Sequence, residues 1–559
     1  MAQESPTPTA SPTILGISGG GHDVAAALFK GTKLVAALEE EKLARVRHAR
    51  GLPARAIRYC LQAGRVKPEK IDYVAVSRPL HGDRGSRASE TWGPKQLKQE
   101  FPSSKILVLD HHLCHAAAAY FPSPFEQAVI LTLDETGDLK TGSLSHARGN
   151  TIEPIEDAYF PDSLGNVFSR AAALAGFAAG SDEHRLQWLS AWGKPVYAPV
   201  FRSILRRDDD SLLSVDQSYF LGNRDERGGF GEKFFAATGI DPAKPLAEQT
   251  RADLAASAQL VLEETVMEIA CRLRARAPGA PLALAGGVAL NSLLVEKLET
   301  SGMFPEVFVQ PAAGNAGNAV GAALYCAHSI LGLSPRVELE HLHYGPEYSV
   351  SDIKDVLENC KLRFRYLKTR EEILAAAVSI LREDHILGWF QGRAEFGPRA
   401  LGARSLLGSP LGPYVSDNLN QYVKHREKFR PFAASVTEER AGEFFEYGPT
   451  AKFLASVGRI RPGSEKTFAE NLLPGRPPGN DGGGAGAARV RVHVVRSGAN
   501  PLFWGLLDAF GRATGLPVLF NTSFNLFGEP LVCSPRDAVR SFYCSGIDHL
   551  ILGNFLLSK

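Results

Sequence analysis

Short apolar runs separated by glycine-rich and polar turns open the chain. Residues 14–48, ILGISGGGHDVAAALFKGTKLVAALEEEKLARVRH, predict a strand, a glycine-rich turn, a second strand, a Lys-Gly-Thr turn, a third strand and a charged segment. The same order of runs returns over residues 128–157, AVILTLDETGDLKTGSLSHARGNTIEPIED. The chain therefore carries two copies of one hairpin plan.

A duplicated hairpin with a short polar turn after the first strand of each copy is typical of the actin/Hsp70-like fold, whose two phosphate-facing turns close over one cleft. Further along, residues 253–276 predict a long amphipathic helix, and residues 282–294 and 308–324 each predict a strand, a glycine turn and a helix. Such glycine turns favour either an anion at the helix N-terminus or close packing of helix on strand, and the sequence leaves both open.

A second α/β segment starts near residue 336. Residues 371–384 predict a helix, residues 385–390 a strand, and residues 515–532 a strand that runs into an Asn- and Ser-rich turn. Residues 472–488, LLPGRPPGNDGGGAGAA, predict a mobile loop or insertion. A chain of 559 residues is too long for one core. We expect a disordered tail (1–13), a first domain (14–335) and a second domain (336–559).

The composition narrows the class of protein. With 44% hydrophobic residues, 22% charged residues and 54 glycines, the chain is typical of a glycine-rich globular enzyme. Its net charge of +1 excludes a general polyanion binder, so any nucleotide must be held by a local basic cluster. The seven cysteines form no Cys-x-x-Cys pair, the N-terminus does not resemble a signal peptide, and no apolar stretch reaches membrane-spanning length. These features predict a cytoplasmic protein that binds neither nucleic acid nor membrane.

Metal-ligand residues gather between Asp110 and Asp138. If HHLCHAAAAY (111–120) is helical, His111 and His115 lie four residues apart on one face, the spacing with which two imidazoles bind one metal ion. Asp134 follows an apolar run that predicts a buried strand, and it offers a carboxylate at the strand end. A His-x3-His pair also arises by chance on surface or core helices, so this pattern alone leaves that interpretation open.

A basic cluster marks the second region. Its six cations lie at turns beside glycines, prolines and aromatic residues, which favours a phosphate-binding pocket over a solvated surface. They are Arg393, Arg399, Arg404, Lys424, Arg426 and Arg430. Asn521 and Ser523, near the end of an apolar strand, offer neutral hydrogen-bonding groups or form a simple polar turn. His22, after three glycines, is either an imidazole base or a solvated turn residue.

Taken together, these motifs resemble the NodU/CmcH carbamoyltransferase family, whose members carbamoylate hydroxyls of aminoglycosides, cephems and nodulation factors. The resemblance spans nearly the whole chain, and its segments occur in the family's order. They are residues 14–28, 38–48, 110–120, 286–291, 392–405, 424–436 and 521–532.

The resemblance implies an actin-like domain, related to the tRNA threonylcarbamoyl transferases, followed by a YrdC-like α/β domain. The YrdC-like domain would form carbamoyl-adenylate from carbamoyl phosphate and ATP, taken up with magnesium. The actin-like domain would transfer the carbamoyl group to a hydroxyl of a small-molecule acceptor. By position, His22 matches the family's base, and Fe(II) or another divalent metal is held by His111, His115, Asp134 and Asn315. The implied carbamoyl phosphate and nucleotide site comprises Arg47, Arg185, Arg393, Arg399, Arg404, Lys424, Arg426, Arg430, Asn521 and Ser523.

Three segments depart from the family's pattern. Asn315 stands where most members carry an aspartate ligand, and an amide oxygen coordinates a metal without supplying charge. In HRLQWLSAWG (184–193), an arginine takes the place of the family's lysine, and Gln187 and Trp188 replace Met and Gly, which puts a bulky indole at the adenylate pocket. Over residues 486–491 the family's acid is missing, and one of two arginines takes the place of its arginine. We interpret the chain as a divergent, active member.

Two alternatives stay open. One is carbamoyl transfer to a non-hydroxyl acceptor such as a thiol or a tRNA base, although the chain lacks the basic bias that tRNA binding requires. The other is a catalytically degenerate nucleotide-binding regulator. Asn315 favours the regulator, whereas the retained histidines and the basic cluster disfavour it, because convergent polar groups are costly to bury. The sequence determines neither the acceptor nor the oligomeric state.

Overall fold

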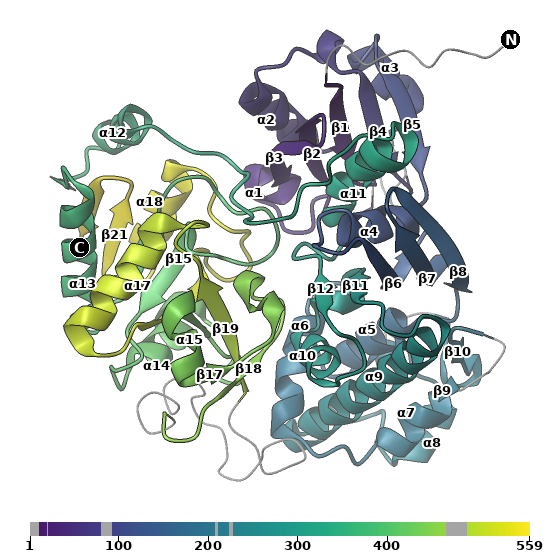
Figure 1. Cartoon of the computed structure of the whole chain (residues 1–559). Helices are drawn as coiled ribbons and strands as arrows, with labels where there is room; N and C mark the ends of the chain where they lie inside the picture. The colour runs from purple at the N-terminus through teal and green to yellow at the C-terminus, as the bar shows by residue number, and fades with distance from the viewer. Residues whose placement is uncertain (1–10, 20, 80–91, 207–210, 223–226, 465–488) are drawn as a thin grey trace, which may run out of the picture.

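Two five-stranded sheets with the same strand order form the N-terminal half (Figure 1). One runs β3-β2-β1-β4-β5 and the other β8-β7-β6-β11-β12. In both, the first three strands are antiparallel and the last two are parallel to the central strand. The predicted duplicated hairpin is therefore confirmed, and with it the actin-like fold of this half. The strands are β1 (Thr13–Ile17), β2 (Ala25–Lys30), β3 (Lys33–Glu39), β4 (Tyr73–Ser77), β5 (Lys105–Leu109), β6 (Gln127–Gly137), β7 (Lys140–Arg148), β8 (Thr151–Tyr159), β11 (Leu282–Ala285) and β12 (Val307–Val309).

The computed structural model describes residues 11–19, 21–79, 92–206, 211–222, 227–464 and 489–559. The loop expected at 472–488 and most of the expected tail lie outside these residues. Strand β1 begins at Thr13, the last residue assigned to the tail, which pairs with Lys30 of β2.

Helices α4 (His111–Tyr120) and α11 (Gly317–Tyr325) pack against each other between the two sheets, with α11 on β1, β2 and β4 and α4 on β6 and β11. The backbones approach closely because the contacts are made by glycines. A Cβ on Gly16 of β1 would lie 1.9 Å from the Ala319 carbonyl oxygen of α11, and a Cβ on Gly321 of α11 would lie 1.9 Å from that of Cys114 in α4. This packing fixes α4 at the junction of the sheets.

The other helices of this half cover the outer faces. Helix α2 packs on β2 and β3, α5 packs on β6, and the long α9 packs against α5, α6 and α7. The helix predicted at 253–276 is the larger part of α9, and the two strand-glycine-helix units are β11 with α10 and β12 with α11. The bounds are α1 (Glu40–Ala44), α2 (Ala54–Gly64), α3 (Pro94–Glu100), α5 (Leu164–Leu174), α6 (Glu183–Leu189), α7 (Ala198–Ile204), α8 (Glu232–Thr238), α9 (Glu248–Arg276), α10 (Ser292–Thr300) and a short hairpin of β9 (Leu205–Arg206) and β10 (Ser214–Val215).

A ten-stranded mixed sheet, in the order β13-β22-β21-β14-β15-β20-β16-β19-β18-β17, is the frame of the C-terminal half. Helices α13 and α17 pack over one face of it, around Trp389 and Phe503, and α12 and α18 over the other, around Phe390 and Phe542. The α/β fold class is therefore confirmed for both halves. The elements are β13 (Arg365–Tyr366), β14 (Leu387–Phe390), β15 (Arg404–Gly408), β16 (Ala433–Thr437), β17 (Phe445–Glu446), β18 (Gly458–Ile460), β19 (Arg489–Val495), β20 (Val518–Ser523), β21 (His549–Leu552), β22 (Phe555–Ser558), α12 (Val350–Asn359), α13 (Arg370–Arg382), α14 (Val415–Asn418), α15 (Glu438–Phe444), α17 (Pro501–Thr514) and α18 (Pro535–Tyr543).

The halves lie side by side and share buried contacts (Figure 1). The expected boundary at 335/336 falls in the segment that leads from the end of α11 and its following helical turn to α12. Leu342 in that segment and Phe396 beyond it belong to the same buried cluster as Phe121 of the N-terminal half. The two halves therefore share one buried cluster of apolar side chains, to which residues of both contribute.

Candidate active site

The two halves enclose a cavity of about 560 Å³. Its walls come from residues 39–48, the start of α6 and residues 312–316 on one side, and from residues 397–400, 424–431 and the turn after β20 on the other. The cationic side chains that line it, apart from Lys42, which pairs with Glu39, are Arg47, Arg185, Arg399, Lys424, Arg426, Arg430 and Arg491.

The cavity gathers most of the residues that the sequence assigned to phosphate and nucleotide. Eight of those ten line it, including Asn521 and Ser523. Arg491 joins them, whereas Arg489, the other arginine considered for this segment, forms an ion pair with Glu296. Both arginines lie on the same face of β19, because side chains two residues apart on a strand point the same way, so their positions along the strand separate the ion pair from the cavity.

Lys424 is buried at the end of a π-helical turn, Leu419–Lys424. Its ammonium group donates to Asn525 Oδ1 (2.6 Å), to the Asn525 carbonyl (3.0 Å) and to the Ser523 carbonyl. Burial, and then the neighbouring arginines, hold the pKa of Lys424 well below its ordinary value. These acceptors are uncharged, so they orient the lysine without neutralising it.

The arginines of the cavity crowd one another. Burial, and then neighbouring arginines, lower the pKa of Arg399 and Arg430 to about 10 and hold the pKa of Arg426 and Arg491 well below its ordinary value. Among the described residues, Arg426 Nη2 and Arg491 Nε are buried and have no hydrogen-bond partner. A ligand with several negative charges would relieve the repulsion and supply the missing acceptors.

Arg393 and Arg404 lie elsewhere, which corrects their assignment to the ligand site. The Arg404 guanidinium is fully buried, donates to four backbone carbonyl groups at 2.8–3.1 Å and stacks on the Phe390 ring at 3.6 Å. Arg393 donates to the carbonyl groups of Tyr344 (2.7 Å) and Val35 (3.0 Å) and so ties the halves together. The glycines and aromatics around these arginines belong to buried turns, which a sequence pattern does not separate from a pocket.

Gln187 and Trp188 also lie outside the wall of the cavity as the described residues define it. Trp188 packs with Leu293 and Val457, and Gln187 Nε2 donates to the Ser292 hydroxyl (2.8 Å). The indole therefore fills a contact between the halves and does not reshape the cavity as expected. Arg185, from the same helix α6, does line it.

His111, His115 and Asp134 converge at the junction of the sheets. His115 Nε2 lies 3.0 Å from His111 Nε2 and 3.0 Å from Asp134 Oδ2, and His111 Nε2 lies 3.5 Å from the same oxygen. The predicted helix at 111–120 is α4, begun by Asp110, whose carboxylate accepts from the Leu113 N–H (3.0 Å). Two imidazole nitrogens and one carboxylate oxygen around a single point fit Fe(II) or another divalent transition metal. We refer to these three residues as the metal trio.

The surroundings of the metal trio orient its ligand atoms. His111 Nδ1 donates to the Arg78 carbonyl (2.9 Å), which turns Nε2 toward the trio. Burial alone would raise the pKa of Asp134, but its contacts with His111 and His115 hold that pKa below its usual range. Asp134 was expected at a strand end, but β6 continues to Gly137 with an irregular register after Leu133.

Gly137→Ala is expected to lower the affinity for metal by about tenfold or more, a loss of the size seen when an orienting contact of a ligand is removed. A Cβ on Gly137 would lie 2.0 Å from His111 Cδ2 and 2.7 Å from His111 Nε2, so the imidazole would have to move. Titration of the metal-free protein with Fe(II) or Zn(II) measures the change. Gly442→Ala, whose Cβ would meet no atom within 4 Å, is the matched control; equal affinities in the two variants would contradict this account.

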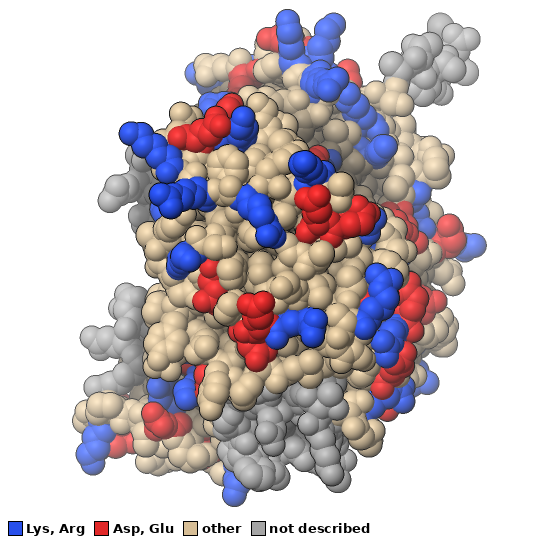
Figure 2. All heavy atoms as spheres, turned by 90° about the vertical axis from the view of Figure 1, so that its left-hand side faces the viewer, with Lys and Arg blue, Asp and Glu red and all other residues tan. Residues whose placement is uncertain are grey.

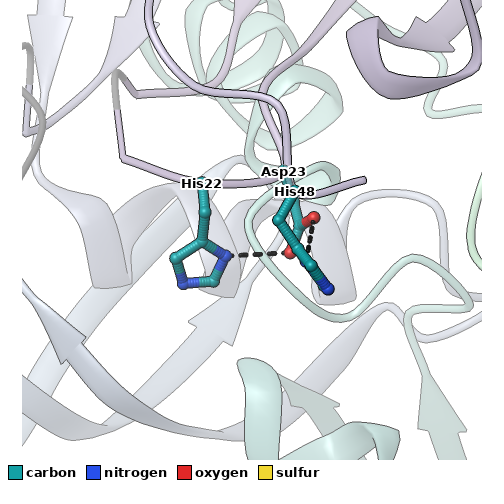
Figure 3. A group of neighbouring side chains, drawn as sticks. All are labelled: His22, Asp23 and His48. Carbon is teal, nitrogen blue, oxygen red and sulfur yellow. Dashed lines mark hydrogen bonds and ion pairs between the residues drawn. The ribbon is translucent and has the colours of Figure 1, made fainter. Parts of the chain in front are cut away.

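Asn315 lies against His22. Its Nδ2 donates to the His22 carbonyl (3.1 Å) and lies 3.5 Å from His22 Nε2. The His22 ring in turn bonds through Nδ1 to Asp23 Oδ2 (2.9 Å), and the other Asp23 oxygen meets His48 Nδ1 at 2.8 Å (Figure 3). The role of Asn315 as a fourth ligand stays a prediction. The sequence analysis missed Asp23 and His48, whose signals were a His-Asp pair after the glycine turn and a histidine beside Arg47.

Two family models cover most of the chain. The carbamoyltransferase N-terminus matches residues 13–84 and 86–324, and the carbamoyltransferase C-terminus matches residues 378–559. The chain belongs to the carbamoyltransferase family. It is therefore a transferase, as the motifs of both halves indicated.

Relatives in the family extend over both halves. The chain is 34% identical to nodulation protein NolNO of Sinorhizobium fredii over 96% of its own length and 79% of the relative. It is 31% identical to the 3'-hydroxymethylcephem-O-carbamoyltransferase of Amycolatopsis lactamdurans over 52% of its own length and 51% of the relative. An uncharacterised protein of Synechocystis matches 98% of the chain, and is itself covered to 96%, at 33% identity.

Solved structures match more weakly. T. kodakarensis HypF has a TM-score of 0.38 at 15% identity, covering 59% of this chain and 49% of HypF. Component A of the Acidaminococcus fermentans (R)-2-hydroxyglutaryl-CoA dehydratase has a TM-score of 0.35 at 18% identity, covering 57% of this chain and all of that one. Scores this low carry no weight for the fold, which rests on the strand order.

The outer surface of the C-terminal half carries mixed charge. Lys and Arg side chains are interspersed with Asp and Glu over the face drawn in Figure 2.

Of the helices that the structure describes, none is both long enough and apolar enough to cross a bilayer.

Proposed function

We propose that the protein forms carbamoyl-adenylate from carbamoyl phosphate and ATP and transfers the carbamoyl group to a hydroxyl of a small molecule. The observation that carries this proposal is the cavity between the halves, where one buried lysine and six half-buried arginines crowd one another around a volume of about 560 Å³. That volume is of the size usual for small-molecule and cofactor sites. Burying so many like charges is costly unless a polyanion binds among them.

Within this reaction the cations act on phosphate oxygens. One water molecule cleaves carbamoyl phosphate to carbamate and phosphate. A carbamate oxygen then attacks the α-phosphorus of ATP, and pyrophosphate leaves. Lys424 and Arg426, which line the C-terminal side of the cavity, would hold the triphosphate, and Arg430 would add charge where pyrophosphate develops. Enclosure between the two halves protects an adenylate that water would hydrolyse.

The metal trio belongs to the transfer half of the proposal. When bound there, Fe(II) or another divalent metal would act as a Lewis acid on the phosphate of the departing AMP. The chain itself contributes orientation, since the Arg78 carbonyl holds His111 and burial lowers the pKa of His115, which keeps that imidazole neutral as a ligand must be. The catalytic role of His22 stays a prediction.

The proposed acceptor is a hydroxyl of a small molecule, because a relative's name specifies O-carbamoylation of a hydroxymethylcephem. The charge of +1 and the mixed face of the C-terminal half give no support to a tRNA acceptor. A degenerate regulator is the second candidate, favoured by Asn315 and disfavoured by the converging ligand atoms of the metal trio.

Pyrophosphate release tests the proposal. Purified, iron-loaded protein is given ATP with and without carbamoyl phosphate, and no acceptor is added. Release that depends on carbamoyl phosphate is the expected result, and it would reduce the question to a search for the acceptor. A folded protein that binds ATP and releases no pyrophosphate would refute adenylation and favour the regulator.

A further inference from the structure

Asp23 holds two histidines at once. Its carboxylate lies between the rings, with one oxygen 2.9 Å from His22 Nδ1 and the other 2.8 Å from His48 Nδ1 (Figure 3). Burial alone would raise the pKa of Asp23, but these two hydrogen bonds lower it. An ionised carboxylate only accepts, so each Nδ1 carries the hydrogen, and the neutral form of the His48 ring then has its lone pair on Nε2.

His48 Nε2 contacts two other residues of the cavity wall, Ser181 and Arg47. Of the two rings, His48 lines the cavity together with Asp23 and Ser181, whereas His22 lies against Asn315. The Ser181 hydroxyl is 2.8 Å from His48 Nε2, and by the tautomer fixed above it donates to that nitrogen. The Ser181 hydroxyl therefore lies next to the Nε2 lone pair of His48. A substrate hydroxyl would lie in the same position before it loses its proton.

The backbone at two of these residues has an unfavourable conformation. Asp23 and His48 both adopt left-handed conformations, with φ of 57° and 53°, which residues other than glycine rarely occupy. The His48 N–H is also tied to Glu41 Oε2 (3.0 Å). Strain of this kind persists where the surrounding contacts enforce a working geometry.

The charged groups around His48 come from three segments. Asp23 and His22 face it from the glycine turn after β1, Glu41 from α1, and Arg47 from its own segment, with Arg47 Nη2 3.3 Å from His48 Nε2. Arg47 is one of the cavity cations, so the nitrogen lies beside a group that attracts the phosphate of an adenylate.

We propose that His48 is the general base that deprotonates the acceptor hydroxyl, and that Asp23 is the residue that positions it. The inference rests on the proposed function, because the group attacked is the carbamoyl carbon of carbamoyl-adenylate. The acceptor oxygen forms a bond to that carbon, the bond from the carbon to the phosphate oxygen of AMP breaks, and the proton passes to His48 Nε2 and then to the departing AMP or solvent.

The test compares two nucleophiles on the iron-loaded holoenzyme given ATP and carbamoyl phosphate. Glycerol needs a base, whereas hydroxylamine attacks through a free amine and gives hydroxyurea without one. In His48→Gln, carbamoylation of glycerol is expected to fall by about 10²-fold or more, while hydroxyurea formation and pyrophosphate release are retained. Asp23→Asn is expected to act in the same direction, because an amide can donate to Nδ1 and leave Nε2 protonated.

Gly442→Ala, whose Cβ would meet no atom within 4 Å, is the control variant and is expected to keep glycerol transfer. His22→Gln tests the rival assignment of the base to His22, and Ser181→Ala tests a direct role of the Ser181 hydroxyl. The inference is overturned if His48→Gln keeps glycerol transfer, or if His48→Gln loses transfer to glycerol and to hydroxylamine equally. It is also overturned if His22→Gln alone loses glycerol transfer.

Loss of transfer in Ser181→Ala would instead indicate that the Ser181 hydroxyl is a covalent carbamoyl acceptor. Loss of a second equivalent of bound metal in His48→Gln would make His22, Asp23 and His48 a metal site. Wild-type protein that releases no pyrophosphate, or that carbamoylates neither nucleophile, would refute the proposed function on which the inference rests.

Discussion

His111→Ala is expected to abolish carbamoyl transfer while leaving carbamoyl-adenylate formation intact. His111 Nε2 is one of three ligand atoms within 3.5 Å of one another, and its removal leaves one imidazole and one carboxylate. Two ligands do not hold a divalent metal in competition with water as three do. The cations assigned to adenylation lie in the cavity wall, mostly on the C-terminal half, and do not touch this site.

The measurement has three readouts on one preparation: metal bound per chain, carbamoylation of glycerol, and pyrophosphate release. His112→Asn is the matched control, because His112 is buried beside the metal trio but its Nδ1 bonds to the Thr132 hydroxyl at 2.8 Å. Metal and transfer are expected to vanish only in His111→Ala. A parallel loss of transfer and pyrophosphate release in that variant would contradict two separate sites.

Local patterns in the sequence were enough to predict the elements that position the metal trio. The Ala-rich run after His111 has helical spacing and forms α4, and the apolar run before Asp134 forms most of β6. The repeated hairpin was also predicted and is confirmed, because consecutive strands joined by short turns tend to pair with each other. What the sequence did not predict is the continuation of β6 beyond Asp134, since that depends on an irregular pairing with β7.

Contacts between distant segments were harder to predict. Arg393, Arg399 and Arg404 lie within one glycine-rich segment and look equivalent in sequence, yet of the three only Arg399 lines the cavity, whereas Arg404 begins β15. The direction of a side chain in an irregular turn is set by the carbonyl groups it meets, and those of Arg404 belong to residues up to 58 positions away. Likewise, nothing local joins Ser181 to His48, which are separated by 133 residues.

Lys424→Met is expected to lower pyrophosphate release by about 10²- to 10³-fold, the loss typical when one charged donor to a transition state is removed. The lysine is buried, its hydrogen-bond acceptors are neutral, and burial holds its pKa well below its ordinary value. Methionine has a similar length and no charge, so the folded protein no longer buries a cation at this position. The acceptors of Lys424 on Ser523 and Asn525 line the cavity, where water can replace the ammonium group. The melting temperature of Lys424→Met is therefore expected to be unchanged or higher.

Arg430→Met is expected to behave in the same way, because burial and the nearby Arg185 lower the pKa of Arg430 to about 10. Arg404→Met is the comparison variant, since Arg404 is fully buried and donates to four backbone carbonyl groups that would lose their partner. Thermal melting and pyrophosphate release are measured on all three variants. Stability is expected to fall in Arg404→Met alone, whereas adenylation is expected to fail in the two folded cavity variants. If the cavity variants lose stability as Arg404→Met does, their cations stabilise the fold. If they lose adenylation and keep their stability, the chain retains these cations to bind a ligand.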